Sequence, residues 1–153
     1  MPLLIRFMFR WFFRLIRLIL TPFMLVAEKL STPKAIKHSA TEQQWLNEAC
    51  QQLALYQFLA CPFCIKVRKE MARLGLAIQK YDAQHNAEHR QQLLSAGGKV
   101  KVPCLRITEA SGKARWLYES AAIIQYLQQL VELSKAHSQT LSEQQTNVKN
   151  SGA

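Results

Sequence analysis

"LALYQFLACPFC", residues 53–64, decides the fold because it leads from a strand into a helix through a pair of cysteines. Alternating apolar residues over 53–58 predict a strand, and apolar residues at helical spacing predict a helix over 62–74, ended by Gly75. Proline is tolerated at the first position of a helix, where its missing N–H is not needed. Pro62 therefore places Cys61 at the N-terminus of this helix and Cys64 one turn further along.

Cys61 and Cys64 have the spacing of a redox-active dithiol. The free N–H groups and the dipole at a helix N-terminus stabilise negative charge, so they favour the nucleophilic thiolate form of Cys61. Cys64 shares a helix face with Val67 and Met71 and is predicted to be less exposed. We therefore predict that Cys61 attacks a substrate disulfide and that Cys64 resolves the resulting mixed disulfide.

Structural zinc is the alternative use of a C-x-x-C pair, since His85 and His89 follow at helical i, i+4 spacing. The interval from Cys64 to His85 is longer than in zinc fingers, and a predicted helix and strand occupy it. We therefore expect no metal and two solvated histidines. Cys50 and Cys104 are predicted to be buried thiols.

The formal net charge of +10 is concentrated at the N-terminus, where residues 1–40 hold seven of the 20 Lys and Arg residues and Glu28 as the only acid. This distribution predicts an anionic lipid surface as the partner. A nucleic acid is not expected, because it needs a basic face on the folded domain. Four cysteines are too few for a disulfide scaffold, so a reducing compartment is expected.

The N-terminal stretch "PLLIRFMFRWFFRLIRLILTPFMLVA", residues 2–27, predicts an amphipathic helix. Its polar stripe consists of Arg6, Arg10, Arg14 and Arg17. The uncharged run over 18–27 is about half of the roughly 20 residues that span a bilayer. Residues 1–30 are therefore predicted to anchor the chain in the membrane interface through residues 1–27, at the cytoplasmic face of the inner (plasma) membrane, with Pro22 kinking or ending the helix. A tilted span and a cleaved signal peptide are the alternatives.

The remaining chain divides into three predicted parts. Residues 31–52 form a linker and a short helix over 41–51, with Thr41 and Gln44 as its capping box. Residues 53–130 follow the order β-α-β-α-β-β-α. After the first strand and helix, its elements are expected at 77–82, 88–96, 102–108, 115–118 and 120–130. Residues 131–153 are polar without a clear period, which predicts a disordered tail.

Three motifs in sequence resemble two related families. "LALYQFLACPFC" (53–64), "GGKVKVPCL" (97–105) and "WLYESAAIIQYL" (116–127) are similar to glutaredoxins and to the thioredoxin-fold N-terminal domain of glutathione S-transferases. The resemblance covers about residues 53–130. It implies an α/β, thioredoxin-like fold with a four-stranded mixed sheet, three flanking helices and Pro103 in the cis form.

The same resemblance implies where glutathione binds. The backbone of Val102, before the cis-proline, would pair with the cysteinyl part of glutathione. Glu119 and Ser120, at the start of the last helix, would hold the γ-glutamyl end, with Ser120 as the helix N-cap. The residues implied to bind glutathione are Val102, Pro103, Glu119, Ser120 and Lys101.

Lys101 enters this set because the chain departs from the glutaredoxin pattern. Phe58 stands where many glutaredoxins have a lysine for the glycine carboxylate, so Lys101 or Arg90 is expected to replace that cation. Phe63 replaces the commoner tyrosine, and residues 121–122 are alanines where glutaredoxins often place aspartates. These departures favour recognition in the transferase style.

The sequence therefore predicts a membrane-associated, glutathione-dependent thiol–disulfide oxidoreductase. It would reduce protein disulfides or glutathionylated proteins, with glutathione as co-substrate. The alternative is a non-enzymatic glutathione-binding module that holds an iron–sulfur cluster or binds a partner. Conjugation of bulky electrophiles is not expected, because a transferase needs a second, all-helical domain that the short polar tail does not supply.

Overall fold

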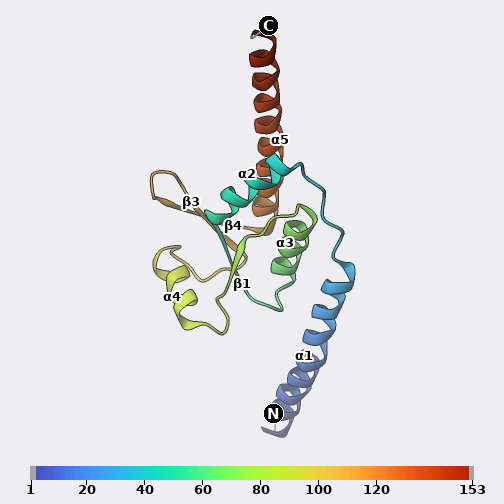
Figure 1. Cartoon of the computed structure of the whole chain (residues 1–153). Helices are drawn as coiled ribbons and strands as arrows, with labels where there is room; N and C mark the ends of the chain where they lie inside the picture. The colour runs from blue at the N-terminus through green and yellow to red at the C-terminus, as the bar shows by residue number, and fades with distance from the viewer. Residues whose placement is uncertain (1–2, 152–153) are drawn as a thin grey trace. The chain divides into compact units, whose positions relative to one another are not determined.

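The computed structural model describes the backbone of residues 3–151 and the side chains of residues 8–16 and 18–144. The chain divides into two compact units, Met1–Thr32 and Pro33–Ala153. The first unit holds α1 (Leu3–Ser31). The elements of the second unit are α2 (Ala40–Gln51), β1 (Leu53–Gln57), α3 (Pro62–Arg73), β2 (Gln79–Asp82), α4 (Ala87–Ser95), β3 (Cys104–Thr108), β4 (Ala114–Tyr118) and α5 (Ser120–Ser151) (Figure 1).

The second unit is built on a four-stranded mixed sheet with the strand order β2-β1-β3-β4. β1 runs parallel to β2 and antiparallel to β3, and β3 runs antiparallel to β4. In Figure 1, α3 lies on one side of β1 and α4 on the other. This order and these two helical layers confirm the predicted thioredoxin-like fold.

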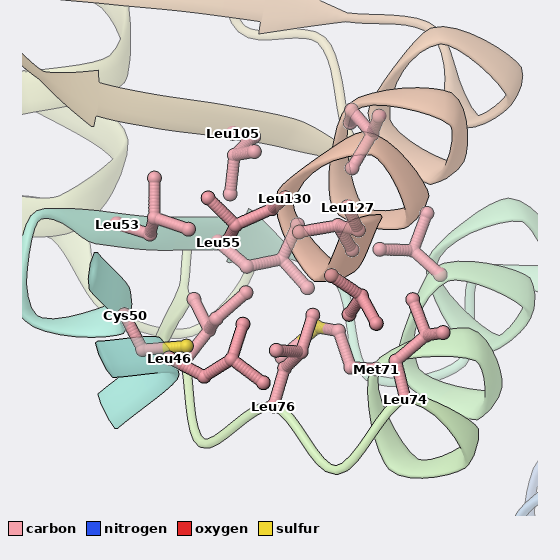
Figure 2. Close-up of a cluster of buried hydrophobic side chains, with 14 of the residues drawn as sticks. Leu46, Cys50, Leu53, Leu55, Met71, Leu74, Leu76, Leu105, Leu127 and Leu130 are labelled. Atoms are coloured by element: carbon pink, nitrogen blue, oxygen red, sulfur yellow. The ribbon is translucent and has the colours of Figure 1, made fainter. Parts of the chain in front are cut away.

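The larger core lies between the sheet and helices α2, α3 and α5 (Figure 2). Leu53 and Leu55 of β1 point into it, and they meet Met71 of α3 and Leu127 of α5. Fully burying one such side chain contributes about 1.5–3 kcal/mol relative to leaving it exposed. This packing fixes α3, and with it the cysteine pair, against the central strand.

The opposite face of the sheet has a smaller core under α4. Because side chains alternate along a strand, Ala54 and Tyr56 of β1 and Cys104 of β3 point to this face, where they pack with Leu93 of α4. The Tyr56 hydroxyl donates a hydrogen bond to Gln92 Oε1 at 3.1 Å. β1 is therefore buried on both faces, as its position in the middle of the sheet requires.

The last helix differs most from the sequence prediction. α5 continues to Ser151 instead of ending at Leu130, so residues 131–151 are helical and not a disordered tail. Helix α2 packs along this extension: the rings of Trp45 and His137 lie 6.0 Å apart, and Ser138 Oγ donates to Glu42 Oε1 at 3.1 Å. Tertiary contacts with α2 thus support α5 as far as Ser138, in a stretch where the polar local sequence does not predict a helix.

The linker between α1 and α2 is fastened to the end of α3. The Ile36 N–H donates to the Arg73 carbonyl at 2.8 Å, and His38 Nε2 donates to the Leu74 carbonyl at 2.8 Å. The capping box of α2 consists of Ser39 and Glu42, with reciprocal backbone-to-side-chain bonds of 3.0 and 3.3 Å. The predicted box at Thr41 and Gln44 is wrong, because the N-cap of α2 is Ser39, two residues earlier than predicted.

α1 continues through Pro22 to Ser31, so Pro22 does not end the helix. Most of its described apolar side chains are exposed, including Met8, Phe9, Trp11, Phe12, Phe13, Leu15, Leu18, Ile19, Leu20, Phe23, Val26 and Leu30. Within the described part of the chain, no helix has both the length and the apolarity that crossing a membrane requires.

Candidate thiol-redox site

Cys61 occupies the N-cap of α3, where the sequence places it. Its backbone is extended, with φ −81° and ψ 122°, and its carbonyl accepts the first helical bond from the Ile65 N–H at 2.9 Å. The Cys61 N–H closes a turn with the Phe58 carbonyl at 3.3 Å. Its thiol makes no capping hydrogen bond, is partly exposed at the positive end of the helix, and hydrogen-bonds the Cys64 thiol.

Cys64 lies one turn further along α3 and is 0% exposed, which confirms the predicted difference in burial. Burial raises the pKa of the Cys64 thiol to about 12, and the neighbouring Cys61 acts in the same direction. A hydrogen bond with the Phe58 backbone and the charge of Arg68 act in the opposite direction. The site therefore offers one accessible sulfur and one protected sulfur that keeps its proton.

Three strands bring the other predicted residues to the same edge of the sheet. Tyr56, Cys104 and Tyr118 are aligned across β1, β3 and β4. The next aligned row consists of Gln57, Pro103 and Glu119. This row lies at the C-terminal end of β1, from which the chain continues to Cys61. The Val102–Pro103 peptide bond is cis, as the family resemblance implies, and Pro103 is buried.

Glu119 and Lys101 form an ion pair with each other at this edge. The hydrogen bond and the charge of Lys101 lower the pKa of the Glu119 carboxyl, which favours its carboxylate form. Glu119 has a φ of 71°, and its carbonyl accepts a hydrogen bond from the Ile123 N–H at 3.0 Å. Glu119 is therefore the N-cap of α5, whereas Ser120, the predicted cap, is its first helical residue.

Arg68 is the residue of this region that the sequence analysis did not single out. Its Nη1 donates to Gln57 Oε1 and its Nη2 donates to the Leu59 carbonyl, both at 2.9 Å. It thus connects α3 to the end of β1 and to the loop before Cys61. The sequence feature that could have identified Arg68 is its spacing of four residues from Cys64, which places both residues on one face of the helix.

Two exposed apolar side chains flank Cys61 in the chain. Leu59 in the preceding loop is 46% exposed, and Phe63 in the first turn of α3 is 63% exposed. Phe58, which stands where many glutaredoxins have a lysine, packs against the smaller core under α4. The surroundings of Cys61 therefore combine apolar surface with the paired charges of the neighbouring sheet edge.

The other cysteines and the two histidines lie outside this arrangement. Cys50 and Cys104 are buried, which raises the pKa of each thiol to about 11. His85 Nδ1 lies 2.9 Å from Asp82 Oδ2, and the His89 ring lies 4.5 Å from that of Tyr81. Among the described residues, no three His, Cys, Asp or Glu side chains gather as metal ligands.

The fold and the cysteine pair define a thioredoxin-like protein with a C-x-x-C site. Comparison with known families makes this more specific, because the family model "Glutathione S-transferase, N-terminal domain" matches residues 55–135, just over half of the 153-residue chain. The chain belongs to this family, and the match includes every residue of the candidate site. This membership and the fold support a role in thiol redox or glutathione-related chemistry.

Comparison with solved structures finds a crystal structure of a mutant of the thioredoxin-like protein BC3987. That protein is 24% identical, and the alignment covers 52% of this chain and 97% of that one, with a TM-score of 0.40. No curated protein matches the chain.

Proposed function

We propose that the protein is a glutathione-dependent thiol–disulfide oxidoreductase of the glutaredoxin type that acts at a membrane surface. One observation carries the proposal: a partly exposed Cys61 at the N-terminus of α3 has a fully buried Cys64 one turn behind it. This arrangement separates an attacking thiol from a protected one, as a dithiol reductase requires.

The reaction exchanges one disulfide for another. The Cys61 thiolate attacks one sulfur of the substrate disulfide, a Cys61–substrate bond forms, and the other substrate sulfur leaves as a thiol after it gains a proton. Cys64 then displaces the bound sulfur, so the substrate is reduced and Cys61–Cys64 is oxidised. One glutathione opens this disulfide to form a mixed disulfide on Cys61, and a second releases oxidised glutathione.

Glutathione would bind along the sheet edge next to Cys61. The Val102 backbone before cis-Pro103 would pair with its cysteinyl part, and Ser120 at the start of α5 would face its γ-glutamyl carboxylate. The ion pair of Lys101 and Glu119 supports this position. A cation beside an anion is complementary to the ammonium and carboxylate that share one carbon in the γ-glutamyl group.

Protein disulfides are the proposed substrates, in addition to glutathionylated proteins. Leu59 and Phe63 place exposed apolar side chains two residues before and two residues after Cys61, which suits a polypeptide segment better than a small charged disulfide. Exposed aromatic side chains of this kind often anchor partner proteins.

α1 would hold the protein on an anionic bilayer, with the cytoplasmic face of the inner (plasma) membrane as the proposed location. Its arginines recur at spacings that place them on one stripe, while exposed rings such as Trp11, Phe12 and Phe23 provide the apolar surface. The arginine stripe would face lipid phosphates, and the rings would enter the boundary of the acyl chains.

The proposal is tested with the full chain on vesicles, as glutathione-coupled reduction of a glutathionylated peptide and of a peptide with an internal disulfide. We expect Cys61→Ser to abolish both reactions. Cys64→Ser should keep the first and lose most of the second, and the control Cys104→Ser should keep both. The proposal is wrong if the wild-type protein turns over neither substrate. Glutathione binding without turnover would instead support the non-enzymatic module, and visible absorbance of fresh anaerobic protein would identify an iron–sulfur cluster.

A further inference from the structure

Arg68 connects three parts of the candidate site through one guanidinium group. It projects from α3 and donates to Gln57 Oε1 at the end of β1 and to the Leu59 carbonyl in the following loop, each at 2.9 Å. Gln57 is only 7% exposed, so its side-chain oxygen depends on a protein donor. The planar fork of an arginine makes two such bonds in a fixed geometry, which a lysine cannot reproduce.

The loop that Arg68 holds also contacts both cysteines. The Phe58 carbonyl accepts the Cys61 N–H at 3.3 Å, and the Phe58 backbone also hydrogen-bonds Cys64. Leu59 follows Phe58 directly, so fixing the Leu59 carbonyl restricts the orientation of both neighbouring peptide groups. The Phe58 bond reaches the sulfur of Cys64 but only the backbone N–H of Cys61, so the contact of Arg68 with Leu59 acts chiefly on Cys64.

Arg68 also lies one turn after Cys64 on the same face of α3, and after the Phe58 backbone bond its positive charge is the second, smaller influence that lowers the pKa of the Cys64 thiol. A buried thiol resists ionisation because the thiolate loses its hydration, and a nearby cation stabilises the charged form. An arginine guanidinium is a delocalised cation, so it can act on a neighbouring thiolate as well as donate hydrogen bonds. The charge of Arg68 favours the Cys64 thiolate, whereas Cys61 opposes it.

We propose that Arg68 is a positioning residue for the resolving step: it holds the loop between β1 and α3 and stabilises the Cys64 thiolate as that thiolate attacks the mixed disulfide. The inference rests on the proposed function. In this step Cys64 loses its proton to solvent, the Cys64–Cys61 bond forms, and the bond between Cys61 and the substrate sulfur breaks. The substrate thiolate leaves with the electron pair and takes up a proton, so this step oxidises the Cys64 sulfur and reduces the substrate sulfur, while Cys61 passes from the mixed disulfide into the Cys61–Cys64 disulfide.

The test follows the two steps separately in the full chain with 5,5′-dithiobis(2-nitrobenzoate), which releases a coloured thiolate at each step. The first release comes from attack by Cys61, and its rate rises with reagent concentration. The second comes from attack by Cys64 on the mixed disulfide, and its rate does not. Cys64→Ser identifies the second phase by removing it.

We expect Arg68→Gln to slow the second release at least tenfold and to leave the first within twofold of wild type. The pH profile of the second release should also move to higher pH. Arg68→Lys should recover part of the rate, because it restores the charge without the two-armed contact. Arg73→Gln is the matched control: it removes an arginine from the same helix whose contacts go to Glu70, and it should change neither phase.

The inference is overturned if Arg68→Gln slows both releases equally, if it changes neither, or if Arg73→Gln has the same effect. Far-UV circular dichroism and the conservative Arg68→Lys variant detect a folding defect. Failure of the proposed function is distinguishable, because a wild-type protein that gives both releases but no turnover with glutathione still tests the role of Arg68.

Discussion

Replacing Gly97 by alanine is expected to destabilise the folded domain by about 2–4 kcal/mol. An added Cβ would lie 2.6 Å from the Leu93 carbonyl oxygen, 2.6 Å from Tyr118 Oη and 3.2 Å from a Trp116 ring carbon. Relieving such overpacking costs about 1–3 kcal/mol. Tyr118 Oη donates to the Gly97 carbonyl at 2.8 Å, and displacing it costs about 0.5–1.5 kcal/mol more.

Urea unfolding followed by far-UV circular dichroism measures this loss as a fall in midpoint of about 1–2 M. Gly98→Ala is the matched control. An added Cβ there meets nothing within 4 Å, and only the φ of +83° makes it unfavourable. Its cost should be about 1–2 kcal/mol, and Gly98→Asn should recover part of it. Equal losses at the two glycines, or a loss at Gly97 below about 0.5 kcal/mol, would refute the steric reasoning.

Gly97→Ala is also expected to weaken glutathione binding. Gly97 begins the loop that leads to Lys101, and Tyr118 Oη holds this loop at the Gly97 carbonyl. A displaced loop should raise the KM for glutathione and leave the rate of Cys61 alkylation unchanged. The double variant with Tyr118→Phe removes one of the two close contacts and should recover part of the stability loss, whereas the KM should stay raised because the hydroxyl that holds the loop is gone.

Three further predictions concern the thiols, the paired charges and helix α1. At neutral pH, limiting iodoacetamide should label Cys61 alone. An unfolded thiol ionises near pH 8.5, whereas burial raises the pKa of Cys64 in the folded protein to about 12. The contribution of the Cys64 thiol to the free energy of unfolding should therefore be complete below about pH 8.5 and decline as the pH rises toward 12. Urea unfolding of wild type and Cys64→Ser across this pH range measures that contribution. Glu119→Gln and Lys101→Gln should each raise the KM for glutathione several-fold in the coupled assay without changing kcat, and an unchanged KM would argue against this binding edge. Arg14→Glu should weaken binding to phosphatidylglycerol-containing vesicles about 30-fold, since each unit of charge contributes about 1 kcal/mol there and the substitution changes the charge by two units. Equal loss on neutral vesicles would contradict the electrostatic account.

The elements around the cysteine pair could be predicted from sequence because local signals agree there. The strand at 53–57, Pro62 at the first helical position and Gly75 after the helix each act within a few residues, and the structure confirms them. Burial of Cys64 followed from the apolar face that it shares with Met71. The cis form of Pro103 came from the family resemblance, since no local pattern distinguishes it.

Features that depend on distant contacts could not be predicted in this way. The polar composition after Leu130 indicates disorder, yet α2 stabilises a helix there through residues such as Trp45, which lie some ninety positions earlier in the sequence. Arg68 resembles an ordinary surface cation until the fold brings the end of β1 to it. The pairing of Lys101 with Glu119 was missed for the same reason, because two strands and a turn separate them in sequence.

The fastening of Ile36 to Arg73 shortens the tether between the two units of the chain. Only the residues from Thr32 to Ile36 remain to bridge them, and an extended chain reaches at most about 3.6 Å per residue, or about 14 Å in total. Along α3, Cys61 lies about 18 Å from the fastening point. If α1 lies on a bilayer as proposed, Cys61 reaches only disulfides within about 30 Å of the last turn of the anchor. The short tether would then select substrates by their height above the membrane, before any contact with the active site.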